Sequence, residues 1–233
     1  RGMLLSNFHT YPVCAPSRAS TMTGRYPFNV GFYVNEDNQC TSNFTSLPAL
    51  LKDAGYSTHA VGKWDIGFVS KECTPTYSGF DTFLGYYTVA QLDYFYHNVS
   101  WAGCSSSVYA RDCTRAAGTH IEGKAGLDGT YSSRIFTAEA TRIIHKHAGN
   151  SRPLYLYVAP MNVHLAIGAD KACRGVQAPC STVDLYPNAT SDTWKVQSAM
   201  TTELDFMVGN VTTALQESGL WDRTLVIFAS DNR

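Results

Sequence analysis

The chain has 233 residues and a formal net charge of -1, and hydrophobic side chains make up 44% of it. This length is enough for one substantial core in a single α/β domain. The nearly balanced charge gives no electrostatic case for binding nucleic acid or an acidic membrane surface. No apolar run approaches the roughly 20 residues of a membrane helix, and none at the N-terminus resembles a signal peptide. We therefore expect no nucleic-acid partner and no membrane span.

The N-terminal region pairs an apolar run with a cysteine at the start of a helix. Residues 3–8 are typical of a strand, and Cys14 then opens a predicted helix. Backbone N–H groups and the helix dipole favour negative charge at such a position, so the sequence predicts an anion site there. Taken alone, a cysteine at a helix start is more often a structural thiol or half of a disulfide.

Helices and strands alternate along the rest of the chain. Helical periodicity and continuous apolar runs predict a helix over 47–54 with a strand over 58–61, a helix over 137–147 with a strand over 154–159, and a helix over 203–217 with a strand over 225–229. Gly149 and Gly219 are helix stop signals. Short connections between alternating elements indicate a mainly parallel sheet with helices on both faces.

Polar groups follow three of the predicted strands, at 62–65, 160–164 and 230–232. Ligands bind at the carboxyl ends of strands in sheets of this kind, so we expect these groups to converge on one edge. The segments 86–134 and 165–193 lack clear periodicity. We interpret them as insertions that wall the site.

Five blocks in this chain resemble a known family in both sequence and order. They are Cys14-Ala15-Pro16-Ser17-Arg18 with Thr23-Gly24-Arg25, Val61 to Gly67, Gly79 to Tyr86, Tyr157-Val158-Ala159-Pro160 leading to His164, and Ser218-Gly219-Leu220-Trp221 leading to Ser230-Asp231-Asn232. This pattern resembles the type I sulfatases, whose signature cysteine is oxidised to formylglycine. The run from Cys40 to Cys73 looks most similar to the arylsulfatase B group (N-acetylgalactosamine 4-sulfatase).

The resemblance implies an alkaline-phosphatase-like α/β sandwich. Residues 1–233 would be part of the N-terminal catalytic domain, lacking its first strand and everything after the Asp-Asn block. That first strand region carries an Asp-Asp pair in the family, and a second sulfate-binding lysine follows the Asp-Asn block. We therefore expect little activity from these 233 residues alone.

The resemblance also implies a calcium-dependent sulfuric ester hydrolase and assigns its residues. Cys14 would supply the formylglycine nucleophile and Arg18 would hold it, while Lys63 and His164 would bind sulfate and act in catalysis. A cation on the sulfate oxygens and a strong nucleophile are what this hydrolysis needs. The metal ligands would be the Cys14-derived oxygen, Asp231 and Asn232, oxygen donors that suit Ca²⁺.

Asp65 stands where the family has a histidine that accepts a proton from the formylglycine hydroxyl. A carboxylate beside Lys63 would stay ionised and could also accept that proton. Its negative charge would face the sulfate oxygens and weaken ground-state binding. We therefore list Asp65 among the catalytic candidates, and keep open that the parent enzyme is slow or has lost activity.

Seven cysteines and four N-glycosylation sequons, at Asn43, Asn98, Asn188 and Asn210, favour a glycoprotein of the secretory pathway, lysosomal or extracellular. Plausible bridges are Cys104–Cys113, Cys173–Cys180 and, partly on the resemblance, Cys40–Cys73, which leaves Cys14 over. The expected partners are a sulfated carbohydrate or aryl sulfate and, during maturation, the formylglycine-generating enzyme.

Other features of the sequence bear on alternative functions. The run 118–125 nearly matches the consensus of a phosphate-binding loop. However, Ala125 replaces the hydroxyl residue that binds Mg²⁺, and no strand precedes the run, so we expect no nucleotide site. A phosphate or phosphonate monoester hydrolase of the same superfold and a non-catalytic sulfated-glycan binding protein stay as alternatives.

Overall fold

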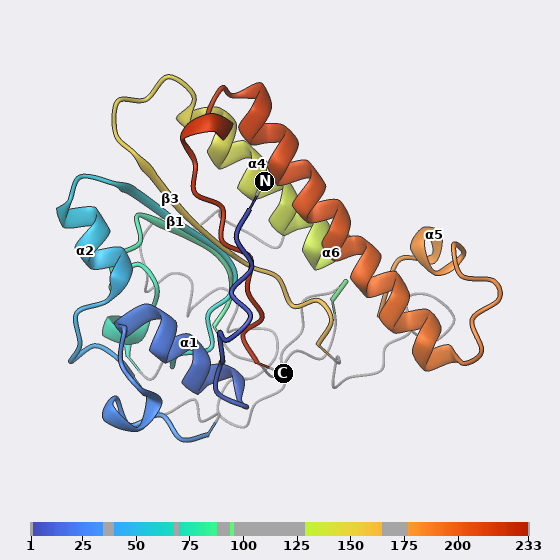
Figure 1. The fold of residues 1–233 in the computed structure, drawn as a ribbon, viewed down its shortest axis with the longest axis horizontal. Coiled ribbons are helices and arrows are strands. Elements are labelled where there is room, and N and C mark those ends of the chain that lie inside the picture. The colour runs from blue at the N-terminus through green and yellow to red at the C-terminus, as the bar shows by residue number, and fades with distance from the viewer. Residues whose placement is uncertain are drawn as a thin grey trace.

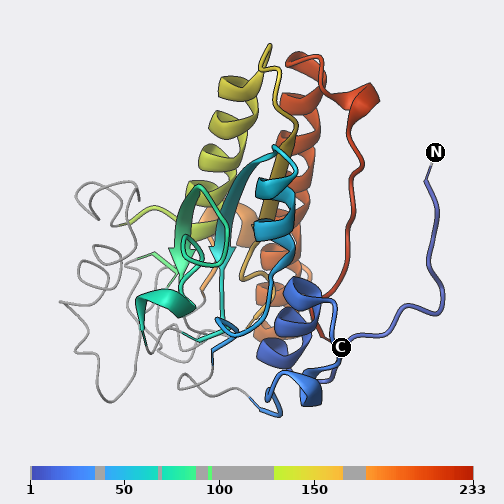
Figure 2. The same cartoon turned by 90° about the vertical axis from the view of Figure 1, so that its left-hand side faces the viewer.

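The computed structural model describes residues 2–34, 40–67, 70–87, 94–95, 129–164 and 177–232. Its centre is a parallel sheet in the order β2-β1-β3, formed by β1 (Ser57–Lys63), β2 (Thr82–Tyr86) and β3 (Leu154–Ala159). Helices cover both faces of this sheet (Figures 1 and 2). The α/β class with a parallel sheet between helices is therefore confirmed.

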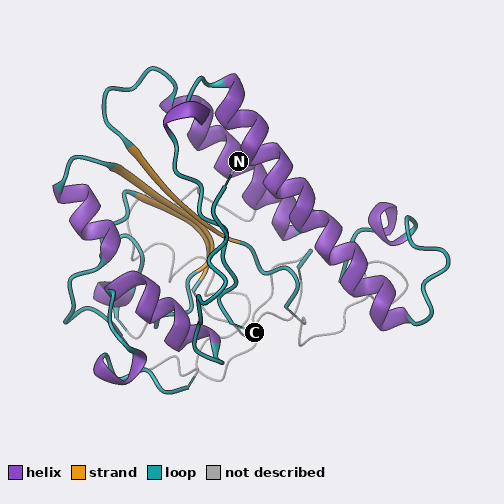
Figure 3. Ribbon diagram, in the orientation of Figure 1, coloured by secondary structure: helices purple, strands orange, loops and turns teal. Residues whose placement is uncertain are grey.

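The helices differ widely in length. In chain order they are α1 (Cys14–Thr23), α2 (Leu47–Asp53), α4 (Ser132–His147), α5 (Cys180–Val183) and α6 (Asp192–Glu217), with 3-10 turns η1 (Pro27–Asn29), η2 (Lys71–Cys73) and η3 (Trp221–Arg223). The long helices α4 and α6 run side by side over one face of the sheet, whereas α1 and α2 lie on the other (Figures 2 and 3).

Alternating side chains of the strands supply the two core layers. Val61, Leu156 and Val158 pack with α4 and α6, whereas Ala60 and Tyr157 pack with α1 on the opposite face. Successive side chains of a strand point to opposite faces of the sheet, so a strand buried on both sides is apolar almost throughout. This explains why the continuous run of β3 was recognisable in the sequence.

Two glycines bring the three strands close together near the carboxyl end of the sheet. A Cβ on Gly62, where φ is +106°, would lie 2.0 Å from the carbonyl oxygen of Ala159 on β3. A Cβ on Gly85 of β2 would lie 1.7 Å from the carbonyl oxygen of Gly62. Neither position can hold a larger residue without displacing backbone, so these glycines fix the spacing of the strand ends that carry the site.

Most predicted elements are confirmed, with shifted bounds. β3 has the predicted bounds, and β1 extends the predicted strand in both directions. Helix α2 matches, while α4 and α6 begin earlier than the predicted 137 and 203. The predicted helix stop signals are also confirmed, because Gly149 and Gly219 both adopt positive φ just after α4 and α6.

Two predicted strands are wrong. Residues 3–8 and 225–229 form no strand, and their large apolar side chains are exposed, from 54% at Val226 to 89% at Leu4. A strand is stable only when its backbone groups pair with a neighbour. Neither segment makes ladder hydrogen bonds (Figure 1), and the first contains a turn in which Phe8 N–H donates to the carbonyl oxygen of Leu5, so apolar composition alone did not make them strands.

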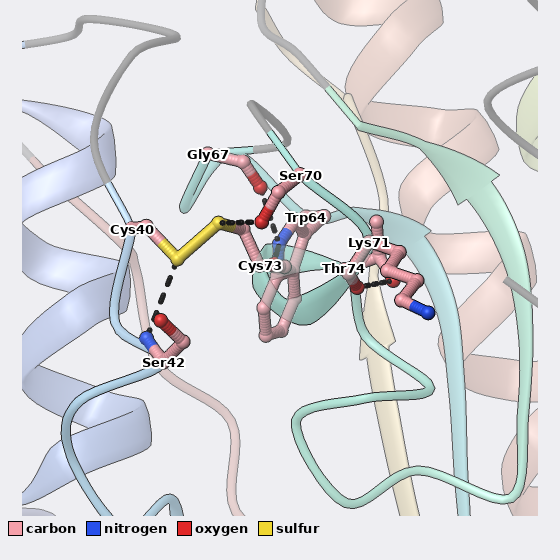
Figure 4. The surroundings of a disulfide bond; sticks show 8 residues. All are labelled: Cys40, Ser42, Trp64, Gly67, Ser70, Lys71, Cys73 and Thr74. Atoms are coloured by element: carbon pink, nitrogen blue, oxygen red, sulfur yellow. Dashed lines mark hydrogen bonds between the residues drawn. A yellow bond between two sulfur atoms is a disulfide. The ribbon is translucent and has the colours of Figure 1, made fainter. Parts of the chain in front are cut away.

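One predicted disulfide joins the segment before α2 to η2. Cys40 and Cys73 are bonded, with Cα atoms 5.2 Å apart. The indole Nε1 of Trp64 donates to the carbonyl oxygen of Cys73 at 3.0 Å, so the bridge supports the loop that follows β1 (Figure 4). Cys180 is also disulfide-bonded, to a cysteine outside the described residues.

Several predictions lie wholly or partly outside the described residues. These are the Cys104–Cys113 bridge, the partner Cys173, the sequon at Asn98, the run 118–125 and most of the two insertions. Of the insertions, the described part contains the start of α4, helix α5 and the start of α6. In the ranges that the structure describes, no helix is long and apolar enough to cross a membrane.

Candidate active site

Helix α1 begins at Cys14, close to the carboxyl ends of the strands. The helix ends at Gly24, which adopts the left-handed conformation that glycine tolerates best. The thiol of Cys14 is buried at 6% exposure and is not part of a disulfide. Within the described residues, Cys14 is the one free cysteine, in agreement with the sequence prediction.

The Cys14 thiol contacts two of the predicted catalytic side chains. His164 and Lys63 both hydrogen-bond it, and the Lys63 ammonium adds a favourable charge. Burial opposes ionisation of the thiol, and so does the nearby carboxylate of Asp231, but the contacts with His164 and Lys63 outweigh them. The pKa of Cys14 therefore lies below its ordinary value.

Lys63 is held in place by a turn at the end of β1. The next residue, Trp64, is almost fully buried, and its backbone N–H donates to the carbonyl oxygen of Tyr86 at 2.8 Å. Asp65 then adopts a φ of +58°, which brings its carboxylate back to Lys63. The Lys63 Nζ to Asp65 Oδ2 distance is 3.1 Å, and the two side chains are only 3% and 4% exposed.

Arg18 connects three parts of the site from α1. Its Nε and Nη2 donate to Asp231 Oδ2 at 2.9 and 2.6 Å. Its Nη1 donates to the carbonyl oxygen of Lys63 at 2.7 Å and to the hydroxyl of Tyr157 at 3.2 Å. Arg18 is 5% exposed, so this guanidinium is a buried connection between α1, the end of β1 and the C-terminal segment.

His164 follows β3 in a turn that several hydrogen bonds fix. Its backbone N–H donates to the carbonyl oxygen of Met161 at 2.7 Å, and its carbonyl oxygen accepts from the hydroxyl of Tyr94 at 2.6 Å. Asn162 anchors the same turn, because its Nδ2 donates to the carbonyl oxygen of Met200 at 2.7 Å and its side-chain oxygen accepts from Ser133. The ring is thus presented to Cys14 from a supported backbone.

The predicted metal ligands provide only part of a calcium site. Asp231 lies at the site, but Arg18 already engages its Oδ2, and Asn232 is half-buried beside it. No group of three or more His, Cys, Asp or Glu side chains in the described ranges is arranged to hold a metal ion. Two side chains and one oxygen at position 14 fall short of the six to eight ligands that Ca²⁺ takes, so we derive no step through calcium.

The lowered pKa of Cys14 predicts a shifted alkylation profile for the unmodified thiol. The thiolate is the reactive form, so iodoacetamide should modify Cys14 at a pH where an ordinary buried thiol is unreactive. Replacing Lys63 with methionine removes the favourable charge and should move the profile to higher pH. Rates measured from pH 6 to 10 by peptide mass spectrometry test this, and an unchanged profile in Lys63→Met would contradict it.

The structure brings the predicted site residues together at one edge of the sheet, and Asn232 lies beside them next to Asp231. Cys14, Arg18, Lys63, Asp65, His164 and Asp231 form one connected group at the carboxyl ends of β1 and β3. This is the arrangement expected when polar groups follow parallel strands. An anion at this position would meet a lysine, a histidine and the start of a helix.

A match of the whole sequence to a known protein family identifies this group of residues. The sulfatase family matches residues 1–233, the whole of the sequence. The chain belongs to the sulfatase family. The predicted family is therefore confirmed, whereas the similarity to the arylsulfatase B group stays a prediction.

Relatives of this sulfatase chain support the assignment. Mouse arylsulfatase J is 33% identical over 99% of this chain and 37% of its own length. Dog N-acetylgalactosamine-6-sulfatase is 29% identical over 99% of this chain and 43% of its own length. The chain thus spans about two fifths of the length of these curated relatives.

Solved structures agree on the fold. Ps i-CgsB superposes with a TM-score of 0.71 and 25% identity, over 91% of this chain and 46% of that one. The PsFucS1 sulfatase from Pseudoalteromonas sp. superposes with a TM-score of 0.64 and 20% identity, over 91% of this chain and 44% of that one. The alkaline-phosphatase-like architecture predicted from the sequence is confirmed.

Sequence reasoning missed three supports of the site. They are the hydroxyl of Tyr157 that accepts from Arg18, the hydroxyl of Tyr94 that holds the His164 turn, and Asn162. Tyr157 could have been found, because a tyrosine inside an apolar strand needs a partner for its hydroxyl. Tyr94 lies in a segment without periodicity and gave no comparable signal. Asn162 lies in the polar group 160–164 that follows a predicted strand, but its contact with Met200 depends on the tertiary fold.

Proposed function

We propose that this protein hydrolyses sulfate esters of a sugar or aryl alcohol, using a nucleophile generated at Cys14. The observation that carries this proposal is the buried Cys14 thiol in contact with both Lys63 and His164, in a chain of the sulfatase family. The whole protein's activity is part of the proposal, because the chain spans only part of its curated relatives.

Conversion of Cys14 to formylglycine fits its surroundings. The side chain is buried, carries no disulfide and lies at a helix start beside an ammonium group and an imidazole. The hydrate of such an aldehyde supplies a hydroxyl nucleophile, with a second hydroxyl on the same carbon, where a thiol stood. The enzyme that makes formylglycine would then be a maturation partner.

The chain's own residues supply charge stabilisation and proton transfer. Lys63 can place its ammonium on the peripheral sulfate oxygens, and negative charge that develops there is stabilised most strongly in a buried site. His164 contacts the same position and can protonate the leaving oxygen. Arg18 positions Lys63 through its backbone carbonyl and fixes Asp231.

We assign Asp65 the role of proton acceptor for the nucleophile. Its carboxylate contacts Lys63, which itself contacts position 14, so Asp65 lies one group away from the attacking atom. The ammonium of Lys63 favours the ionised carboxylate, which is the form that can accept a proton. Burial of the pair keeps competing water away from this exchange.

The modification of Cys14 tests this function directly. Protein made with its maturation enzyme should yield a Cys14 peptide whose mass shows replacement of the thiol by an aldehyde. The same peptide from a host without that enzyme should carry an unmodified cysteine. An unmodified cysteine in a competent secretory host would overturn the nucleophile and favour the sulfated-glycan binding protein.

Calcium binding is the second part of the proposal, and the 233 residues alone should bind it weakly. The described part of the chain offers Asp231 and Asn232 with an oxygen at position 14, and Arg18 competes for Asp231. These three oxygen donors are fewer than the six to eight ligands that Ca²⁺ takes, so the affinity should be low. Calorimetry that shows tight calcium binding by these residues would contradict this prediction.

A secretory route, lysosomal or extracellular, completes the proposal. Asn43, Asn188 and Asn210 are all exposed, as glycan acceptors must be. The Cys40–Cys73 disulfide suits an oxidising compartment. Mapping of glycopeptides and disulfides from protein secreted by eukaryotic cells would test this assignment.

A further inference from the structure

We propose that Asp65 is a specificity-determining residue, which makes the site discriminate against doubly charged anions and restricts it to monoanionic sulfate esters. The inference rests on the proposed function, because it concerns the same site. The property by which the site would distinguish substrates is their charge.

Asp65 lies close to the position that a bound anion would take. Its Oδ2 lies 3.1 Å from Lys63 Nζ, and both side chains are at least nine-tenths buried. An anion that accepts a hydrogen bond of about 2.8 Å from the same ammonium is therefore within about 6 Å of the carboxylate. The anion and Asp65 share one cation at close range.

Positive and negative side chains are paired in the site. Lys63 and Arg18 contribute two positive charges, while Asp65 and Asp231 contribute two negative charges. Asp65 also acts electrostatically on Arg18 and Tyr157, so its field reaches across the site. Compared with a neutral residue at this position, the Asp65 carboxylate lowers by one unit the positive charge that the site offers to a ligand.

Sulfate and phosphate monoesters differ in charge at the pH of the experiment. A sulfate monoester carries one negative charge, whereas a phosphate monoester, with a second pKa near 6, carries almost two above neutral pH. A unit charge about 6 Å away, at an effective dielectric constant of about 20, changes affinity about 100-fold per charge on the ligand. The unfavourable electrostatic free energy is twice as large for a dianion, so Asp65 favours binding of the monoanion.

Calorimetry with phenyl sulfate and phenyl phosphate at pH 8 tests the proposal. Both probes have the same aryl group, and a Cys14→Ser background prevents conversion and turnover. We expect Asp65→Asn to strengthen phenyl phosphate binding about 10- to 100-fold more than phenyl sulfate binding. Asp65→Glu retains the charge and should keep the original ratio of the two dissociation constants.

Asp81→Asn is the matched control for the loss of one negative charge. Asp81 accepts from the backbone N–H of Thr58 near the start of β1, about 16 Å along the strand from Lys63. This distance exceeds the Debye length at physiological salt, so the control should leave the ratio unchanged. Circular dichroism of each variant verifies that the comparison is made on folded protein.

The outcomes separate this inference from the proposed function. An unchanged ratio in a folded Asp65→Asn variant would overturn the inference, even if the converted enzyme hydrolyses sulfate esters. A shifted ratio in a protein that hydrolyses neither ester would support the inference and contradict the proposed function. Failure of both probes to bind any folded variant would overturn both, because no anion site would exist.

Discussion

Asp65→Asn is expected to lower the turnover number for an aryl sulfate by roughly 10²- to 10⁴-fold in the mature enzyme. The amide keeps the shape of the side chain but cannot accept the proton from the nucleophile, and this loss is typical of removing a general base. KM should change less, because the ammonium of Lys63 remains available for sulfate. Steady-state kinetics on one aryl sulfate provide the measurement.

Asp65→His is the companion variant, since imidazole is also a proton acceptor. Activity should be preserved or increased if Asp65 acts as the base. If the wild-type protein is already inactive, Asp65→Asn changes nothing and Asp65→His alone restores some turnover. An active wild type whose Asp65→Asn variant keeps full activity would refute both versions and leave His164, which contacts position 14, as the acceptor.

Arg18→Ala is expected to lower the free energy of unfolding by about 3 kcal/mol. The substitution leaves the carbonyl oxygen of Lys63 without its donor and Asp231 without its cation, and breaking a buried ion pair costs about 3 to 5 kcal/mol. We take the low end because Asp231 is 33% exposed and solvent can replace part of the interaction. Urea unfolding followed by tryptophan fluorescence measures the change.

Arg25→Ala is the control for this stability experiment. Arg25 is exposed just beyond the same helix and lies 5.5 Å from the centroid of the Phe44 ring, a contact worth about 0.5 to 1 kcal/mol. Arg18→Ala should therefore be clearly less stable than Arg25→Ala. Equal stabilities would mean that the cost of burying Arg18 offsets all four of its hydrogen bonds.

The sequence allowed much of the fold to be predicted wherever burial left a simple pattern. β3 is apolar throughout because both faces are covered, and α4 and α6 show one apolar stripe each. β2 was missed because Thr82–Tyr86 is short and contains Gly85, so its identity depends on pairing with β1. Residues 225–229 have the composition of a strand but no paired neighbour, which composition cannot reveal.

The sequence allowed the residues of the site to be predicted, but it revealed fewer of the contacts between them. Polar residues after β1 and β3 had to meet at one sheet edge, and Lys63 and His164 do meet at Cys14. The ion pair between Lys63 and Asp65 was harder to predict from the sequence, since it depends on the positive φ of Asp65. Asparagine and aspartate tolerate this conformation, but their presence does not require it.

The tight contact among Gly62, Gly85 and Ala159 has a consequence for changing this enzyme in the laboratory. Residues with side chains at positions 62 and 85 would collide with backbone atoms of the neighbouring strand. Libraries that randomise these glycines should consist mostly of misfolded proteins. New substrate ranges are better sought in libraries at the exposed residue 163, where the chain has left the sheet.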